Sequence, residues 1–179
     1  IIPQATELFQ RFEEEAAQVS EDEVNNHKAF VQRDLHPLIM RAPFPYRAFY
    51  KPLGYAGDYE MVNMMLRDPR EGPTTYAELV NTLILLAGPP QAHRNRIVIL
   101  ENWLLEAAAR FSQKGRPLKV LNVGCGPAIE LQRFIHDDEL AARCHFRLVD
   151  FSEETLQYTQ EQISKSIAES HNDPRIELV

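Results

Sequence analysis

The sequence predicts an α/β protein in which a helical region precedes a parallel sheet. Two observations support this fold class. Apolar residues recur at helical spacing through the first two thirds of the chain, and from Lys119 onward short apolar strands alternate with helices. A strand–helix–strand–helix–strand order of this length indicates parallel strands joined by right-handed crossovers. We therefore expect a helical N-terminal cap or lid at residues 1–116 and the beginning of an α/β domain at residues 117–179.

The helical region begins with two predicted helices. Apolar residues at helical spacing indicate the first, over residues 5–19. Ser20 and Glu23 form a capping box that is expected to open the second. Pro43 and Pro45 are expected to end that second helix and to begin an aromatic loop.

Three further helices are expected before the sheet. Asp58 is predicted to cap a short helix that ends at Leu66, and Thr75 with Glu78 forms another capping box. The helix that Thr75 opens should stop at Gly88, because two prolines follow. A long helix with one apolar face should then run to about Gly115.

The sheet region contains three predicted strands, at residues 119–123, 145–150 and 175–179. A helix at residues 127–136 joins the first two, and a helix opened by Ser152 joins the second to the third. The third strand would leave an unpaired edge, so association of copies through that edge is expected.

Composition excludes several classes of function. The chain of 179 residues has a formal net charge of -7, which does not attract the phosphate backbone of a nucleic acid. Its two cysteines cannot form a disulfide framework, and neither has the neighbours of a zinc site, so no metal is expected. No apolar run is long enough to span a membrane, so no membrane association is expected and a cytoplasmic protein is the simplest interpretation.

The most informative motif follows the first predicted strand. That strand runs directly into the sequence Gly-Cys-Gly-Pro-Ala at residues 124–128, and a helix follows. Gly124 and Gly126 suit a sharp turn at which the backbone approaches a ligand closely. The dinucleotide fingerprint G-x-G-x-x-G would require glycine where Ile129 stands. This mismatch disfavours a nucleotide-dependent oxidoreductase.

The loop with its flanking strand and helix resembles the first motif of class I S-adenosylmethionine-dependent methyltransferases, whose fold is Rossmann-like. The resemblance implies that S-adenosylmethionine is the methyl donor and S-adenosylhomocysteine the product. Asp150, at the end of the second strand, would bind the ribose hydroxyls, and Phe151 would lie against the adenine. The residues that the resemblance places in the cofactor-binding loop are Asn122, Gly124, Cys125, Gly126, Pro127 and Ala128.

The chain departs from this family pattern at two positions and in its extent. Asn122 stands where the family has an acidic residue, and Ala128 where it commonly has glycine. The family has a seven-stranded sheet, of which only three strands can be identified here. We therefore expect the sequence, which lacks an initiator Met and stops at Val179, to be the first part of a truncated domain that is inactive alone.

The segment at residues 47–58 combines aromatic side chains, cations and glycines, a composition suited to closing over a small ligand. Residues 51–58 of this segment, Lys-Pro-Leu-Gly-Tyr-Ala-Gly-Asp, resemble bacterial methyltransferases for the biosynthesis of the extracellular factor 3-hydroxypalmitic acid methyl ester. So does the sequence Ala-His-Arg-Asn-Arg at residues 92–96, with the long helix that follows it. The resemblance would place Tyr55 and Asp58 near the amino-acid end of the cofactor. Candidate substrate-binding residues are Tyr46, Arg47, Tyr50 and Arg94.

A structural role remains open for these pre-sheet residues. The tyrosines could belong to the core, Asp58 could simply cap a helix, and Arg94 and Arg96 could be surface cations or could pair with a carboxylate.

The expected activity is methyl transfer to a small molecule. A carboxylate acceptor is already a nucleophile and needs no general base, whereas an amine or hydroxyl usually needs one. No catalytic base is identifiable, which is compatible with carboxyl O-methylation of a fatty-acid-like acceptor. The alternative is a non-catalytic module, derived from a methyltransferase, that binds the cofactor or a partner.

Overall fold

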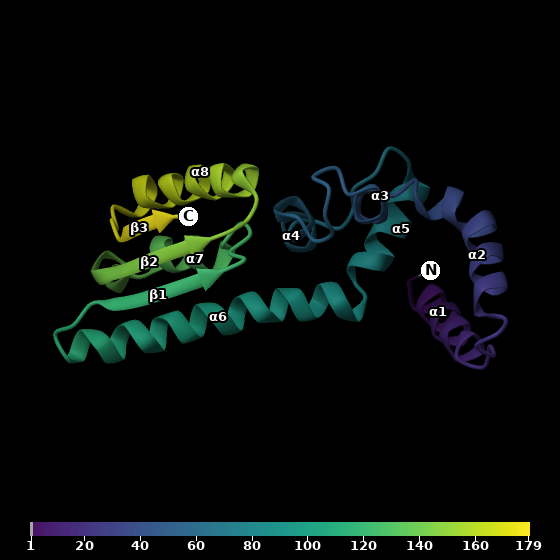
Figure 1. The fold of residues 1–179 in the computed structure, drawn as a ribbon, viewed down its shortest axis with the longest axis horizontal. Helices are drawn as coiled ribbons and strands as arrows, with labels where there is room; N and C mark the ends of the chain where they lie inside the picture. Colours follow the sequence, from purple (N-terminus) through teal and green to yellow (C-terminus); the bar gives the residue numbers. More distant parts are fainter. Residues whose placement is uncertain (1) are drawn as a thin grey trace. The chain divides into compact units, whose positions relative to one another are not determined.

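The computed structural model describes residues 2–179 and confirms the α/β class (Figure 1). The chain forms two compact units. The first unit consists of the residues up to Ala56 together with Arg67–Gln91. The second unit consists of Gly57–Leu66 and Ala92–Val179. This division differs from the expected boundary between residues 116 and 117, because a pre-sheet helix and most of the long helix belong with the sheet.

The first unit is helical. Its helices are α1 (Ile2–Ala16), α2 (Val24–Ile39), α3 (Pro43–Tyr50) and α5 (Thr75–Leu85). The expectation of a loop after Pro43 is wrong, since α3 begins at that residue. The first amides of a helix have no intrahelical acceptor, so the missing N–H groups of Pro43 and Pro45 cost nothing there.

The region around Gly88 differs from the prediction for the same reason. Helix α5 ends at Leu85, and α6 (Gly88–Gln113) begins at the glycine that was expected to be a stop. The two prolines after Gly88 fall in the first turn of α6, where proline is tolerated.

Two predicted capping boxes differ from the observed caps. Helix α2 begins only at Val24, after a turn, and no side chain caps its first amides. The Ser20 hydroxyl instead faces the Glu23 carboxylate, with 3.5 Å between Oγ and Oε2. Helix α5 is capped by Thr74 and not Thr75, because the Thr74 backbone is extended and its Oγ1 accepts a 3.2 Å bond from the amide of Ala77.

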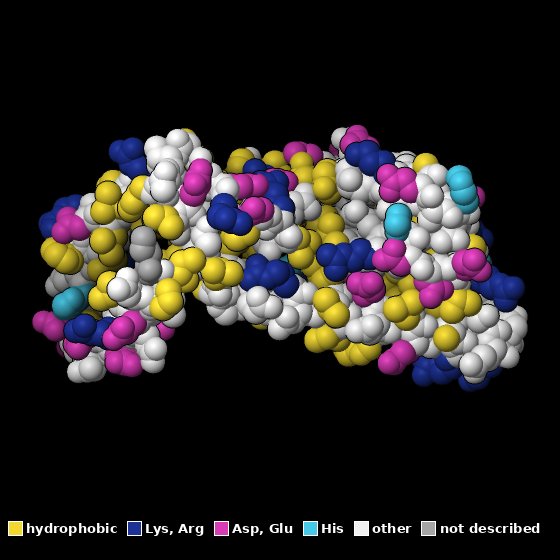
Figure 2. Space-filling model, turned by 180° about the vertical axis from the view of Figure 1, so that it is seen from behind, with side chains coloured by type: hydrophobic (Ala, Val, Ile, Leu, Met, Phe, Trp, Pro, Cys, Tyr) yellow, Lys and Arg dark blue, Asp and Glu magenta, His cyan; other side chains and the backbone are white. Residues whose placement is uncertain are grey.

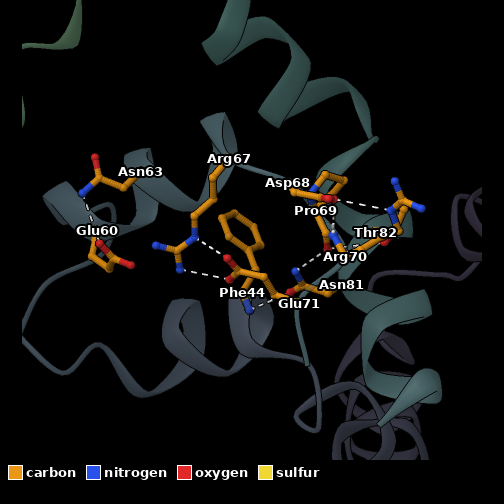
Figure 3. Close-up of polar contacts among 10 residues, drawn as sticks. All are labelled: Phe44, Glu60, Asn63, Arg67, Asp68, Pro69, Arg70, Glu71, Asn81 and Thr82. Carbon is orange, nitrogen blue, oxygen red and sulfur yellow. Dashed lines mark hydrogen bonds and ion pairs between the residues drawn. The ribbon is translucent and has the colours of Figure 1, made fainter. Parts of the chain in front are cut away.

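A buried asparagine holds the first unit together (Figure 3). Asn81 is 0% exposed. Its Oδ1 accepts a 2.9 Å bond from the amide of Phe44, and its Nδ2 donates a 2.8 Å bond to the carbonyl of Pro69. Phe44 is buried, whereas Phe49 on the same helix is half exposed. Asn81 thus joins α3, α5 and the turn at residues 67–73 through polar contacts.

Helices α1 and α2 bury none of their described side chains within the chain. Figure 2 shows hydrophobic side chains on the surface of this unit, at the left of the view. The large apolar residues exposed on these helices include Leu8, Phe9, Phe12, Phe30 and Leu38.

The second unit contains the sheet. Its strands are β1 (Leu118–Val123), β2 (Cys144–Val149) and β3 (Arg175–Leu178), all parallel and in the order β1-β2-β3. Helix α7 (Ile129–Asp137) and a short 3-10 helix (Glu139–Arg143) connect β1 to β2, and α8 (Glu153–Ser170) connects β2 to β3. Ser152 caps α8 as expected, since its Oγ accepts a 3.2 Å bond from the amide of Thr155. This arrangement is consistent with part of a Rossmann-like sheet.

One face of the sheet forms the core of the second unit. Leu118, Phe146 and Leu148 project from this face and are buried. Side chains of α6, α7 and α8 cover them, with Phe134 of α7 packed edge-on against Phe146. Residues alternate between the faces of a strand, so Leu121 and Val123 lie on the opposite face, where they are 63% and 72% exposed.

Strands β1 and β3 are the two outer strands of the sheet formed by the described residues. Helix α4 (Tyr59–Leu66) also belongs to this unit. None of the helices in residues 2–179 has the length and apolar character that crossing a bilayer requires.

Candidate functional site

The loop after β1 has an unusual backbone conformation. Gly124 and Gly126 have φ values of +67° and +53°, which glycine adopts at little cost. Ala128 also has a positive φ, of 49°. A Cβ added at either Gly124 or Gly126 would meet no protein atom within 4 Å. The backbone of the turn therefore favours glycine at both positions, and the space that a side chain would fill there is open.

The amides of this loop are already hydrogen-bonded within the protein. The amides of Gly124 and Cys125 donate to the carbonyl of Val149 over 2.8 and 3.1 Å, and that of Ala128 donates to Cys125. The amide of Gly126 donates to Asp150 Oδ2 over 3.0 Å. A phosphate cradle requires amides directed at the ligand. None of these four amides is therefore free to face a pyrophosphate.

Asp150 fixes the loop to the end of β2. Its Oδ2 accepts from Gly126, and its Oδ1 accepts a 3.1 Å bond from the amide of Ser152. Thr159, fully buried on α8, donates a 2.7 Å bond to the carbonyl of Gly126. Because each carboxylate oxygen has two acceptor positions, Asp150 retains capacity for a further donor. Phe151, the next residue, is 78% exposed.

A cavity of about 310 Å³ lies beside the loop, within the second unit. This volume is at the lower end of the range for small-molecule sites, roughly 300–1,000 Å³. The loop residues expected to bind the cofactor, from Asn122 to Ala128, line it. The other lining residues are Gly57, Val62, His93, Arg96, Ile97, Leu100, Ile129 and Glu130.

Glu130 places a carboxylate in the wall of this cavity. The residue lies in the first turn of α7, and its Oε1 accepts a 3.1 Å bond from Asn122 Nδ2. Burial raises the pKa of the Glu130 carboxyl above its ordinary value. Hydrogen bonds from its own backbone amide and from Asn122, and the positive charge of Arg96, oppose this rise in pKa. Desolvation of the carboxylate thus outweighs the favourable contacts that the protein supplies.

Arg96 places a cation in the same cavity. Its Nη2 lies 2.9 Å from Nε2 and 3.2 Å from Nδ1 of His93, three residues earlier on α6. Burial, and to a lesser extent the charge of Arg96, lowers the pKa of His93 below its usual value. A neutral His93 can accept a hydrogen bond from the guanidinium of Arg96.

Cys125 has a different character. Burial, followed by the negative charges of Asp150 and Glu130, raises the pKa of its thiol to about 11. The thiol is therefore protonated at neutral pH, and a role as a nucleophile is disfavoured. The described residues 2–179 contain no group of three or more His, Cys, Asp or Glu side chains that could hold a metal ion.

Helix α4 contributes to the cavity through Gly57, which precedes it, and through Val62. Asp58 is 1% exposed and caps this helix as expected, with Oδ1 accepting a 3.0 Å bond from the amide of Met61. Arg94 Nη1 donates a 2.8 Å bond to the carbonyl of Met65 near the end of the same helix. The structure thus gives Asp58 and Arg94 positioning contacts at the two ends of α4.

Contacts with α8 also hold α4 in the second unit. Tyr59 stacks on Tyr158 with a centroid distance of 4.3 Å, and Tyr59 OH donates a 3.3 Å bond to Glu154. Asn63 Nδ2 donates a 2.9 Å bond to Tyr158 OH.

The remaining predicted residues belong to the first unit. Tyr46 and Tyr50 lie one helical turn apart on α3, with ring centroids 4.3 Å apart. Arg47 lies on the same helix, and Tyr55 follows it in the chain.

Sequence reasoning identified the loop but missed Glu130 and the support from Thr159. An acidic residue in the first turn after a glycine loop was a usable signal for Glu130. Thr159 carried no such signal, since it is one polar residue within a long helix. The sequence does not distinguish Arg94 from Arg96, whereas in the structure Arg96 lines the cavity and Arg94 bonds to α4.

Nothing matches this chain among the protein-family models, the curated proteins or the solved structures with which it was compared. The assignment of a function therefore rests on the residues and geometry of the cavity.

Proposed function

We propose that the second unit binds S-adenosylmethionine and that the protein is a methyltransferase acting on a small molecule. The observation that carries this proposal is a glycine loop whose amides are bonded within the protein beside an open cavity. Such a loop suits a nucleoside ligand that has no phosphate groups. The residues present fit this cofactor, since the cavity wall offers a carboxylate and a guanidinium.

The chain's own residues would hold the cofactor in distinct ways. The loop at residues 124–128 supplies a surface free of side chains for close approach. Asp150 would accept hydrogen bonds from the ribose hydroxyls with its remaining acceptor positions, and exposed Phe151 would cover the adenine. These roles of Asp150 and Phe151 are the ones that the resemblance to class I methyltransferases implies.

The bound cofactor would supply a methyl group on a positively charged sulfur. An acceptor carboxylate forms the new carbon–oxygen bond as the carbon–sulfur bond breaks, and the electron pair of the broken bond leaves with sulfur. A carboxylate acceptor has no proton to lose, so the protein must only align the reactants and exclude water. The proposed acceptor class is a fatty-acid-like carboxylate.

Calorimetric titration with S-adenosylhomocysteine and with NAD tests the cofactor. We expect binding of S-adenosylhomocysteine, and binding of NAD alone would overturn the proposal. Asp150→Ala should weaken that binding by about 10-fold or more, because it removes the anchor of the loop and a ribose acceptor. Asp173→Ala, which changes an exposed carboxylate of the same unit, is the matched control and should leave affinity unchanged.

Transfer of a labelled methyl group to a panel of carboxylic acids tests the reaction. Cofactor binding without transfer to any carboxylate, amine or hydroxyl acceptor would favour a non-catalytic binding module instead.

A further inference from the structure

Two opposite charges share the wall of the cavity beside the glycine loop. Glu130 of α7 and Arg96 of α6 both line this space, and the charge of Arg96 is felt at the Glu130 carboxyl. They form no ion pair within 4.0 Å among the contacts of the described residues, so each retains capacity for a ligand. A separated anion and cation in one small cavity match the two charges of an α-amino acid.

We infer that Glu130 binds the ammonium and Arg96 the carboxylate of the cofactor's amino-acid end, an inference that rests on the proposed function. Asn122 stands where a carboxylate is the family pattern, and its side-chain amide bonds to Glu130. The carboxylate of the cavity wall therefore comes from the first turn of α7 and not from the end of β1. Asn122 holds this carboxylate in place.

The electrostatics of the cavity wall support this assignment. Desolvation raises the pKa of the Glu130 carboxyl and so disfavours its charged form. Hydrogen bonds from Asn122 and from the Glu130 backbone amide only partly oppose this rise in pKa. A ligand ammonium would supply the charge-assisted contact that this carboxylate lacks. Arg96 is oriented by His93 on one side, and a guanidinium can still donate to both oxygens of a carboxylate.

Ligand analogues separate the two contacts. The test compares S-adenosylhomocysteine with its deaminated analogue, its decarboxylated analogue and 5′-methylthioadenosine, which lacks both charged groups. Glu130→Gln should weaken binding of S-adenosylhomocysteine by about 10- to 100-fold and leave the deaminated analogue unaffected. Arg96→Gln should weaken it similarly and leave the decarboxylated analogue unaffected. Neither substitution should change binding of 5′-methylthioadenosine.

A charge swap tests whether Glu130 acts through its charge. The double variant Asn122→Asp with Glu130→Gln exchanges the two side-chain types and keeps a donor facing an acceptor. It should recover most of the affinity that Glu130→Gln loses, because the cavity regains its anion. Glu101→Gln removes an acidic residue of α6 that faces Arg133 at 3.7 Å and does not line the cavity. This control should bind like the wild type.

The possible results are distinct. If the wild type binds neither S-adenosylhomocysteine nor its analogues, the proposed function fails. The wild type could bind these ligands while Glu130→Gln weakens the binding of all four equally, or of none. That result would overturn the assignment of Glu130 and leave the proposed cofactor unaffected. An equal loss for all ligands in Arg96→Gln would overturn the assignment of Arg96 in the same way.

Discussion

The two units of this protein use buried polar groups differently. In the first unit, Asn81 has both ends of its side-chain amide bonded to backbone groups, and it serves structure alone. In the second unit, Glu130 is held by Asn122, but burial still disfavours its charge. Fully satisfied polar groups rigidify a fold, whereas partly compensated ones at a cavity indicate a place for a ligand. The comparison locates the candidate site in the sheet unit.

Replacement of the buried Asn81 should have the largest effect on stability. Asn81→Ala leaves the buried amide of Phe44 without its acceptor, and it removes one of two side-chain donors to the carbonyl of Pro69, which keeps the bond from Thr82 Oγ1. The orphaned amide costs roughly 1–3 kcal/mol and the lost bond to Pro69 about 1 kcal/mol, so the first unit should lose about 3 kcal/mol of stability. Hydrogen exchange of the α3 and α5 amides measures this loss locally.

An exposed asparagine on α2 provides the control for that experiment. Asn26→Ala should change stability by less than about 0.5 kcal/mol. A similar small change for Asn81→Ala would mean that the bonds of Asn81 do not hold this unit together.

A substitution in the glycine loop should have the next largest effect on stability. Gly124→Ala forces alanine into a left-handed conformation at a cost of about 1–2 kcal/mol, and it adds a methyl group to the open space beside the cavity. Gly115→Ala is the matched control, because Gly115 has a similar φ of +64° and equally open surroundings. Thermal unfolding should show equal losses for the two variants, and calorimetry should show loss of S-adenosylhomocysteine binding for Gly124→Ala alone. Equal affinities would remove the loop from the site.

The contact between α4 and α8 should have a smaller effect. Tyr158→Phe keeps the stack on Tyr59 and removes the hydroxyl that accepts from Asn63, which should cost about 1 kcal/mol. Because α4 lines the cavity through Val62, affinity for S-adenosylhomocysteine should fall slightly. Chemical denaturation and titration check both effects, and unchanged stability would show that the hydroxyl contact does not hold α4.

Glu130 should give the smallest effect on stability, with a distinctive dependence on pH. Its pKa is raised in the folded state, so the ionised carboxyl destabilises the fold above that pKa and the penalty disappears when pH falls through it. Glu130→Gln should therefore be more stable than the wild type at pH 7 and equal to it in acid. Thermal unfolding as a function of pH measures the difference. A variant less stable at pH 7 would mean that Arg96 and Asn122 already offset the desolvation of Glu130.

The fold was largely predictable because its strands and helices have strong local patterns. Short apolar runs predicted the β-strands correctly, and capping chemistry predicted the roles of Ser152 and Asp58. The errors arose at Pro43 and Gly88, where proline was interpreted as a helix terminator although it also favours the first helical turn. Proline alone does not distinguish the end of one helix from the start of the next.

The site was less predictable than the fold. Its loop has a local signature, and residues 124–128 do line the cavity. The pairing of Asn122 with Glu130 depends on how α7 packs against β1, and the choice of Arg96 over Arg94 depends on where α4 docks. Such long-range contacts leave no periodic pattern in the sequence. The roles of the loop, Asp150 and Phe151 toward a cofactor stay predictions.

Hydrogen exchange of the whole protein, measured with and without S-adenosylhomocysteine, tests whether this ligand binds to the sheet unit. We expect the ligand to slow exchange in residues 122–130 and at the end of β2 around Asp150, and to leave α1 and α2 of the first unit unaffected. Absence of protection in residues 122–130, or protection confined to the first unit, would contradict the assignment of the site to the sheet unit.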